Sequence, residues 1–490
     1  MKAITSRSRN VPSWEGVSAK GGRSDHGVTP SETPETGNDP LWEGVPAKPA
    51  RRLRMRLIQR QSAIGAAPGG RHTFPQGVHA PGWFAAFTLL LAAFLLSACG
   101  NGREAPEPVA ATPEDPVAAL RQALMDATPG SVVTIPEGRL EVDRGLSLNV
   151  SGVTVRGAGS DRSILSFAGQ RAGAEGLLVT ADDVTLEGFA VEDTRGDAIK
   201  VSGCRNLVMR DLRAEWTGGP SEDNGAYGLY PVQCEGVLIE HSVAIGASDA
   251  GIYVGQSRDI IVRYNRAEYN VAGIEIENSI GADVYANEVL HNTGGILVFD
   301  LPGLPMQGGR KTRVFRNHVL DNNTPNFAPE GNIVATVPAG SGILVSANRD
   351  VEIFANRIQE HGTAAVLVLS YLITDRPFDD PDYDPYPERV HVHNNHFGRS
   401  GYAPDSEPLA MLHGQLERDL PPLIWDGFVR EGAGDPVICA HDNSEEDAFI
   451  LDAPGGFAGA RFAVDTFDCR LPSLAGISDA GADVPVEWEE

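Results

Sequence analysis

Basic residues are scarce in this chain. Its 490 residues include 40 Lys and Arg against 66 Asp and Glu. Residues 1–98 hold 12 of the basic and 6 of the acidic residues, which leaves 28 against 60, a net charge of −32, for residues 99–490. Because phosphate contacts need a basic surface, this balance excludes a nucleic acid as partner. A polyanionic ligand would need a local basic patch or Ca²⁺ to bind so acidic a protein. We predict no obligatory cofactor, with Ca²⁺ as the one alternative.

Apolar runs long enough to cross a membrane are not evident either. Trp83 to Ala98 is an apolar run of 16 residues, short of the roughly 20 that a membrane span needs and typical of a secretory signal. The residues Leu96-Ser97-Ala98-Cys99-Gly100 resemble the bacterial lipobox, whose Cys is acylated and becomes the mature N-terminus. We therefore expect a lipid anchor at Cys99 and, from Gly100, an outer-membrane lipoprotein of the cell envelope. A plain signal peptide or a short anchor is the alternative.

The segments around this signal lack apolar periodicity. We expect residues 1–82 to be disordered or to reflect an over-extended start codon, since they are rich in Pro, Gly, Ser and Arg. Residues 83–99 are the signal segment with its lipobox, and the Pro/Glu-rich residues 100–113 are a linker. Residues 473–490 form an acidic tail.

A repeat dominates the middle of the chain. Gly228, Gly251, Gly273 and Gly295 each open a similar unit, at steps of 23, 22 and 22 residues. Each unit holds two or three strand-length runs of Val, Ile and Leu that alternate with polar residues, and none is long enough for a helix. The pattern of leucine-rich repeats is missing. Because one such unit cannot bury its own apolar face, the sequence predicts a parallel β-helix with turns stacked about 4.8 Å apart.

A second set of residues repeats with the same period. Asparagines follow the second strand of successive units at Asn265, Asn287, Asn317, Asn356 and Asn395. Stacked turn upon turn, their amides should hydrogen-bond along an internal ladder. Cys204 and Cys234 also occupy equivalent places one turn apart, which permits either a disulfide or two buried thiols. Cys439 and Cys469 could pair in the C-terminal region, since a secreted compartment allows disulfides.

Residues 114–400 resemble the right-handed parallel β-helix families, which include pectate lyases, alginate lyases and mannuronan epimerases. The resemblance implies an all-β solenoid but does not fix an activity. A helix capping the first turn is expected over Thr112–Met125, with Thr112 as N-cap and Pro113 at N1. Residues 401–472 should be irregular final turns and a cap, and LAMLHG, LIWDGFV and VICAHDN are the candidate last strands. Insertions after Gly295 and over residues 371–388 should form loops on one face.

Alternation along the strands predicts which side chains face outward. One outward column is Lys200, Tyr230, Tyr253, Glu275, Leu297 and Leu344, and the next is Ser202, Val232, Gly255, Glu277, Phe299 and Ser346. Tyrosines and carboxylates therefore gather over neighbouring turns, a combination that suits a sugar. The predicted catalytic residues are Asp249, Tyr253, Glu275 and Glu277; the predicted substrate-binding residues are Tyr227, Tyr230, Gln233, Gln256, Asn278 and Asp300. A solvated sheet face with β-favouring tyrosines is the alternative.

One stretch invites a closer comparison. The mannuronan epimerase motif Tyr-Gly-Phe-Asp-Pro-His-Asp/Glu corresponds here to Tyr227-Gly228-Leu229-Tyr230-Pro231-Val232-Gln233. Tyr230 and Val232 replace the catalytic Asp and His, so epimerisation by that route is disfavoured. For metals, Asp380, Asp382 and Asp384 lack the Gly and Glu of a calcium loop. His391 and His393 share a strand face without an evident third ligand, so we expect an exposed sheet there and no metal site.

The sequence thus predicts a monomeric envelope lipoprotein whose β-helix engages a polysaccharide. Three functions remain in competition at this point: a lyase-like or glycoside-hydrolase-like enzyme, a non-catalytic glycan-binding module, and a structural or partner-binding lipoprotein. Converging carboxylates and tyrosines favour the first.

Overall fold

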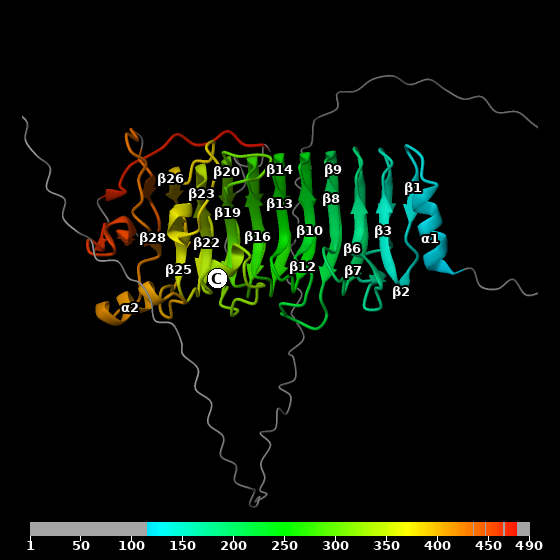
Figure 1. Cartoon of the computed structure of the whole chain (residues 1–490), viewed down its shortest axis with the longest axis horizontal. Helices are drawn as coiled ribbons and strands as arrows, with labels where there is room; N and C mark the ends of the chain where they lie inside the picture. The colour runs from blue at the N-terminus through cyan, green and yellow to red at the C-terminus, as the bar shows by residue number, and fades with distance from the viewer. Residues whose placement is uncertain (1–114, 435, 446, 464–465, 478–490) are drawn as a thin grey trace, which may run out of the picture. The chain divides into compact units, whose positions relative to one another are not determined.

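The computed structural model describes residues 115–434, 436–445, 447–463 and 466–477. Cys99, the signal segment and the linker lie outside the described residues, as does most of the acidic tail. The described part forms a parallel β-helix whose turns stack side by side in chain order (Figure 1). Nowhere in this part does a helix have the length and apolar character that crossing a membrane requires.

Two sheets make up the wall of the β-helix. The 12-stranded sheet contains β3 (Arg144–Leu148), β6 (Ala172–Val179), β8 (Ile199–Ser202), β10 (Tyr227–Val232), β13 (Ala250–Gly255), β16 (Ala272–Glu277), β19 (Gly294–Phe299), β22 (Ser341–Ser346), β25 (Ala364–Leu369), β28 (Leu423–Trp425), β30 (Ala448–Ile450) and β31 (Arg461–Phe462). Its order follows the chain without a crossover, and each of its pairings except β30–β31 is parallel.

The 19-stranded sheet supplies the other two sides of each turn. It contains β1 (Val132–Thr134), β2 (Gly138–Glu141), β4 (Thr154–Arg156), β5 (Ser163–Ser166), β7 (Thr185–Glu192), β9 (Arg205–Glu215), β11 (Glu235–Glu240), β12 (Val243–Ile245), β14 (Arg258–Arg263), β15 (Arg266–Glu268), β17 (Ile280–Tyr285), β18 (Glu288–Leu290), β20 (Arg310–Phe315), β21 (His318–Leu320), β23 (Arg349–Phe354), β24 (Arg357–Gln359), β26 (Glu388–His393), β27 (His396–Phe397) and β29 (Ile438–His441). The strands β13, β14 and β15 thus form one turn, and β16, β17 and β18 form the next.

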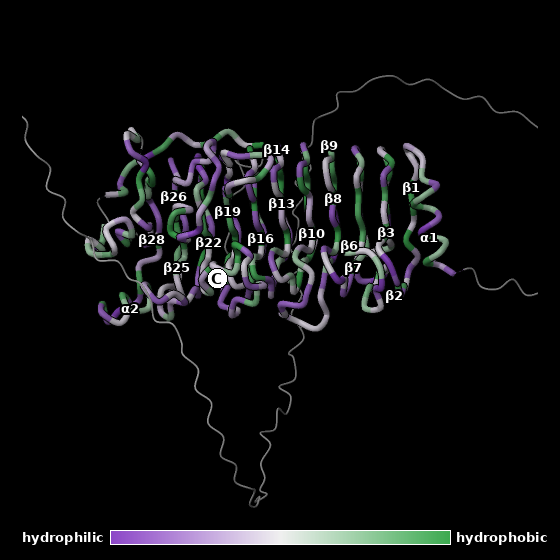
Figure 2. The backbone as a smooth tube through the Cα atoms, viewed as in Figure 1, coloured by the Kyte–Doolittle hydropathy of each residue, from purple (hydrophilic) through white to green (hydrophobic). Residues whose placement is uncertain are grey.

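The interior is filled by the inward-facing aliphatic residues of all three sides. Ile252, Ile274 and Ile296 pair in successive turns and are fully buried, and Val254, Ile276 and Val298 form the adjacent inner row. Polar and apolar residues alternate along the strands of Figure 2, as expected where one strand face is interior. The predicted fold is confirmed, including a helix that caps the first turn.

The capping helix begins later than the sequence suggested. It is α1 (Pro116–Met125), and its N-cap is Asp115, whose side chain accepts a hydrogen bond from the Val117 amide at 3.0 Å. The N-cap and the proline in the first turn are thus Asp115 and Pro116 in place of Thr112 and Pro113. The predicted apolar stripe Val117, Leu120 and Leu124 is buried.

The predicted asparagine ladder is present and longer than expected. Asn265, Asn287, Asn317, Asn356, Asn395 and Asn443 are joined in sequence by Nδ2–H···Oδ1 bonds of 3.0–3.1 Å. A second ladder, which was not predicted, lines the next corner and runs from Asn270 through Asn292 to Asn322 and His361. The repeat spacing of these residues was visible in the sequence and could have revealed it.

Asn287 tests how much a ladder residue contributes. Its Nδ2 donates to the Val262 carbonyl and to Asn317 Oδ1, and its Oδ1 accepts from both the backbone and the side chain of Asn265. Replacing Asn287 with Leu leaves these buried partners unpaired, so we expect a loss of at least about 1–3 kcal/mol in the free energy of unfolding. Chemical denaturation measures it, with the surface substitution Gln415→Leu as control; equal stability of both variants would contradict the internal position of the ladder.

The C-terminal region is partly helical. The segment LAMLHG, expected as a strand, lies in α2 (Glu407–Leu416), because Ser406 caps the helix by accepting from the Leu409 amide and Pro408 lies in its first turn. The other two candidate strands are β28 and β29. The chain also closes two disulfides, Cys204–Cys234 and Cys439–Cys469.

Both predicted insertions fold onto the outer face of the 12-stranded sheet. Val334 and Val337 of the first insertion pack in one apolar cluster with Leu297, Phe299 and Leu344 of the sheet. The second insertion joins the first: Gly303 N–H donates to Asp380 Oδ2 at 2.8 Å and Tyr383 Oη donates to the Asp300 carbonyl at 2.6 Å. This half of the face is therefore covered.

Candidate functional site

The outward columns lie where alternation placed them. Tyr253 pairs with Glu275 and Gly255 with Glu277 between β13 and β16, and both columns continue to Leu297 and Phe299 on β19. The outer face of the 12-stranded sheet therefore changes character along the helix axis. Tyrosines and acids occupy the turns of β10, β13 and β16, and apolar side chains follow from β19 onward.

Three tyrosines form a compact group on the polar half. The ring centroids of Tyr227 and Tyr230 are 4.4 Å apart, those of Tyr227 and Tyr253 4.6 Å, and those of Tyr230 and Tyr253 5.0 Å. Tyr227 and Tyr230 are half-buried, whereas Tyr253 is buried. Lys200 lies over the Tyr230 ring, with Nζ 4.7 Å from the centroid. The rings of Tyr227 and Tyr230 are therefore partly accessible at the surface, and the phenol of Tyr253 lies buried beneath them.

Each of two carboxylates is paired with a tyrosine hydroxyl. Tyr253 Oη donates to Glu277 Oε1 at 2.6 Å, and Gln256 Nε2 donates to the same oxygen at 3.1 Å. Tyr227 Oη donates to Asp249 Oδ2 at 3.3 Å. Charge-assisted hydrogen bonds of this kind fix the orientation of both partners.

Gly255 makes the first of these pairs geometrically feasible. A Cβ at this position would lie 2.3 Å from Tyr253 Oη and 2.4 Å from the ring. The missing side chain lets the Tyr253 ring lie along its own strand and reach Glu277, which is opposite Gly255 on the next strand. The absence of a side chain at Gly255 thus allows the Tyr253 hydroxyl to bond Glu277.

Burial shifts the carboxyl groups toward neutrality. It raises the pKa of Asp249 to about 7, with the charge of Glu277 adding to the shift and the Tyr227 hydrogen bond opposing it. Burial also raises the pKa of Glu277 to about 7, against the hydrogen bond from Tyr253. Both groups therefore exchange protons near neutral pH, as general acids and bases must.

Glu275 lies deeper than the other acids. Its side chain is 1% exposed, and neither carboxyl oxygen has a hydrogen-bond partner among the described residues. Burial raises its pKa well above the usual value, and the charges of Glu277 and Asp249 raise it further. Burial thus favours the neutral form of Glu275, and a bulky ligand does not reach it, so its predicted catalytic role is not supported by its position.

The remaining predicted residues divide into two groups. Gln233 is exposed and Gln256 bonds both Tyr253 and Glu277, so both belong to the tyrosine–acid region. Asn278 and Asp300 instead hold the first insertion: Asn278 Nδ2 donates to the Leu301 and Met306 carbonyls, and Asp300 accepts from the Gly308 and Gly309 amides. Their hydrogen bonds position the loop beside the site.

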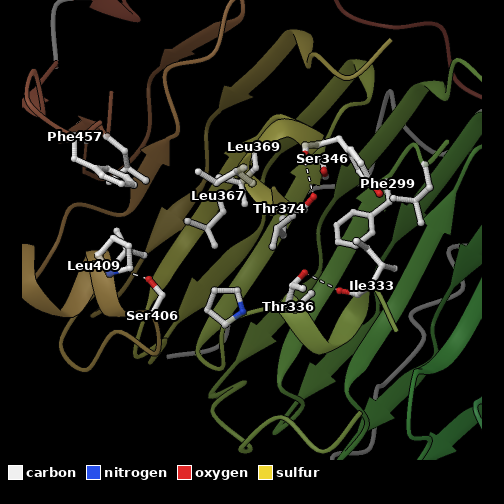
Figure 3. A pocket seen from close by; sticks show the side chains of 18 residues that line it. Phe299, Ile333, Thr336, Ser346, Leu367, Leu369, Thr374, Ser406, Leu409 and Phe457 are labelled. Carbon is white, nitrogen blue, oxygen red and sulfur yellow. Dashed lines mark hydrogen bonds between the residues drawn. The ribbon is translucent and has the colours of Figure 1, made fainter. Parts of the chain in front are cut away.

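Two hollows adjoin the acids on either side. One, of about 450 Å³, is lined by Gln233, Gln256 and Met306 and also by Arg205 and Arg258. The other, of about 290 Å³, begins at Phe299, which is opposite Glu277 on the next strand, and is apolar. Figure 3 shows Leu367, Leu369 and Ile333 pointing into it. Gln233 and Gln256 of the polar hollow were among the predicted residues, whereas Arg205 and Arg258, the first residues of β9 and β14, were not predicted.

His391 and His393 lie on the opposite wall, in the 19-stranded sheet. Their expected exposure is wrong: His391 is 5% exposed and His393 is half-buried. The C-terminal segment covers them, because the Leu474 amide donates to Glu352 on the neighbouring strand at 2.9 Å. Figure 1 shows this red segment running across the turns. The acidic loop residue Asp380 accepts bonds from Gly303 and Asp382 amides.

Comparisons with known proteins agree with the fold. Residues 175–373 match the family described as "Right handed beta helix region", and no curated protein matches the sequence. The Azotobacter vinelandii mannuronan C-5 epimerase AlgE4 A-module is 17% identical, with a TM-score of 0.41 over 67% of this chain and 89% of that one. The alginate lyase AlyF-OU02 in complex with G6 is 15% identical, with a TM-score of 0.34 over 59% and 69%. The DFA-IIIase of Arthrobacter chlorophenolicus A6 is 12% identical, with a TM-score of 0.37 over 68% and 88%. At these identities the likeness concerns the fold alone.

Proposed function

We propose that this right-handed parallel β-helix is an enzyme that cleaves a glycosidic bond in a polysaccharide, at the tyrosine–acid region of the 12-stranded sheet. The observation that carries the proposal is the pair of buried carboxyl groups, Asp249 and Glu277, each bonded to a tyrosine hydroxyl and each with a pKa raised to about 7. The two carboxyl groups can act as general acid and base, and the partly accessible tyrosine rings beside them can stack on a sugar.

The hydrogen bonds of Glu277 and Asp249 suggest a separate catalytic role for each carboxyl group. Glu277 is bound by Tyr253 and Gln256, so its proton is held at a defined atom and can be delivered to a leaving oxygen. Asp249 takes the complementary role of base, with Tyr227 as its hydrogen-bond partner. The charge of Glu277 raises the pKa of Asp249 and so disfavours ionisation of both carboxyls at once.

The polar hollow extends this site toward an acidic sugar. Arg205 and Arg258 line it together with Gln256, which also bonds Glu277. A guanidinium group can neutralise a sugar carboxylate, a requirement of cleavage by elimination. Asp182 and Glu235 line the same hollow, and Arg205 is paired with Asp182 at 2.6 Å. The hollow therefore carries no net positive charge, and an anionic glycan would depend on Arg258.

A non-catalytic glycan-binding module is the second candidate. Asp249 is 6% and Glu277 7% exposed, so their access to a glycosidic oxygen is narrow. A binding module would use the rings of Tyr227 and Tyr230 and would keep the acids as a structural group. Binding and turnover therefore have to be measured separately.

Replacing Tyr230 with Ala tests the sugar surface. Tyr230 is the half-buried ring between Lys200 and Tyr253, so we expect its loss to weaken glycan binding by on the order of 1–3 kcal/mol. A glycan array, followed by titration of the best ligand, measures the change. Tyr264→Ala serves as control, because Tyr264 is 42% exposed on the other sheet; equal weakening by both variants would place the binding surface elsewhere.

We also propose that the protein is anchored to the outer membrane through a lipid on Cys99. The support is the lipobox-like sequence at the end of the apolar run. Replacing Cys99 with Ala should release the protein from the membrane fraction and remove the acyl mass from the mature N-terminus. Cell fractionation and mass spectrometry measure both; a Cys99→Ala protein that stays in the membrane with an unprocessed N-terminus would contradict the anchor.

A further inference from the structure

A cluster of metal-binding side chains lies on the 19-stranded sheet, away from the tyrosine–acid region. Glu352 belongs to β23, His391 and His393 to β26, and His441 to β29. Glu352 pairs with His391 and His393 pairs with His441 in the register of these parallel strands. Side chains of adjacent turns stand about 4.8 Å apart, so the stacking of three turns brings the four residues together on one face.

The potential ligand atoms converge. One ligand atom each from Glu352, His391 and His393 lies within 4.8 Å of the other two. His393 Nε2 is 3.1 Å from Glu352 Oε1, and His441 Nε2 is 2.8 Å from His391 Nε2. Separations of this order are typical of atoms that share one ion, because bonds of about 2 Å from Zn²⁺ place tetrahedral ligands a little over 3 Å apart.

Outer contacts orient the cluster toward a common centre. His393 Nδ1 contacts Asn394 Oδ1 at 2.8 Å, and His441 Nδ1 contacts Asp442 Oδ2 at 2.9 Å. Glu352 Oε2 accepts from the Leu474 amide. These contacts leave His393 Nε2 facing Glu352 Oε1, and His441 Nε2 facing His391 Nε2. Metal-ligating histidines are held by carboxylate or carbonyl oxygens in the same manner.

One assignment of the histidine tautomers leaves an excess of lone pairs inside the cluster. If Nδ1 of His393 and of His441 each carries the hydrogen that it donates to its oxygen partner, Nε2 of His393 carries none. His393 Nε2 and Glu352 Oε1 are then two hydrogen-bond acceptors that face each other. His441 Nε2 is then an acceptor as well, so His391 Nε2 donates to it, and the buried His391 Nδ1 has no partner among the described residues. A divalent cation would satisfy these facing lone pairs together, whereas additional protons would place positive charge in a buried site.

We propose that Glu352, His391, His393 and His441 bind a divalent transition-metal ion, best matched by Zn²⁺. Imidazole nitrogens with one carboxylate are characteristic of Zn²⁺ sites, whereas Ca²⁺ and Mg²⁺ prefer oxygen ligands throughout. Cys439 pairs with His391 in register but is held in the disulfide with Cys469. The ion joins three turns and, through Glu352, the C-terminal segment that contains Leu474.

The test uses the full chain, stripped with a chelator and dialysed. Titration with ZnCl₂ should show one ion per chain, elemental analysis should recover it after desalting, and the melting temperature should rise with Zn²⁺. The His393→Ala variant should bind at least about 100-fold more weakly, since loss of an outer partner alone costs 10–100-fold. His396→Ala is the matched control, because His396 is exposed on β27.

Two further measurements keep the result decisive. Co²⁺ in place of Zn²⁺ should give the visible absorption of a four-coordinate nitrogen–oxygen site in the wild-type protein and in His396→Ala, but not in His441→Gln or His393→Ala. Absence of stoichiometric Zn²⁺ and of the Co²⁺ spectrum in the folded wild-type protein would overturn the proposal. So would Zn²⁺ affinity that His393→Ala and His441→Gln leave unchanged. A Glu352→Gln variant that loses stability equally with and without Zn²⁺ would identify a simple Glu352–His393 ion pair and also overturn it.

Discussion

Replacing Glu277 with Gln should reduce glycan turnover by at least about 100-fold while leaving binding within a few-fold of wild type. The amide keeps the size of the side chain and can still contact Tyr253 and Gln256, which bond Glu277 Oε1. It cannot release a proton to a leaving oxygen. Turnover and affinity are measured on the same glycan, by product release and by titration.

Glu222→Gln is the matched control for this variant. Glu222 is exposed in the loop before β10, so the same chemical change there should leave turnover unaltered. Full turnover in Glu277→Gln would remove Glu277 from the chemistry, even if the glycan binds. A parallel loss of binding and turnover would point instead to a collapsed site, which the melting temperature of the variant would reveal.

The protein should lose several kcal/mol of stability as the pH rises from about 4 to about 7. Asp249 and Glu277 have pKa values raised to about 7 in the folded chain, whereas in the unfolded chain they titrate near 4. Across this window the folded state keeps protons that the unfolded state has released, so stability is full below the unfolded pKa values and falls until the folded values are passed. A shift of this size corresponds to roughly 3 kcal/mol or more for one carboxyl.

Denaturation at a series of pH values measures this decline. In the Asp249→Asn and Glu277→Gln variants, the free energy of unfolding should depend less on pH than in the wild type. Between about pH 4 and pH 8 each variant should therefore lose less stability than the wild type. Buried Glu275 contributes with the same sign, because its pKa is also raised. A wild-type stability that stays constant or rises through this window would show that the acids are ionised in the folded protein.

Periodicity explains which features the sequence could predict. The 22-residue spacing fixed the neighbour of each residue in the next turn, so Tyr253 opposite Glu275 and the ladder at Asn287 followed from counting. Inward and outward facing followed from strand alternation. These properties depend only on local geometry that every turn repeats.

Features outside the period could not be predicted. Leu297 and Phe299 face outward as predicted, but the sequence did not show that Val334 and Val337 of the first insertion pack on them. The cover over His391 comes from a segment some 80 residues later, at Leu474. Loops and termini have no repeat to set their partners, so their contacts depend on tertiary packing that the sequence pattern does not encode. The pairing of Glu352 with His391 was, in contrast, obtainable from the asparagine ladder, because Asn356 and Asn395 have the same separation in the sequence.

Glycan cleavage by the tyrosine–acid region, as proposed, is measured with the wild-type chain and its variants. The wild-type chain is incubated near neutral pH with neutral and anionic polysaccharides, and new reducing ends and the ultraviolet absorbance of unsaturated products are followed together. We expect at least one glycan to yield new chain ends with wild type and with Glu222→Gln, but not with Glu277→Gln. Wild-type protein that binds a glycan without producing chain ends would contradict the enzymatic claim and leave a binding module.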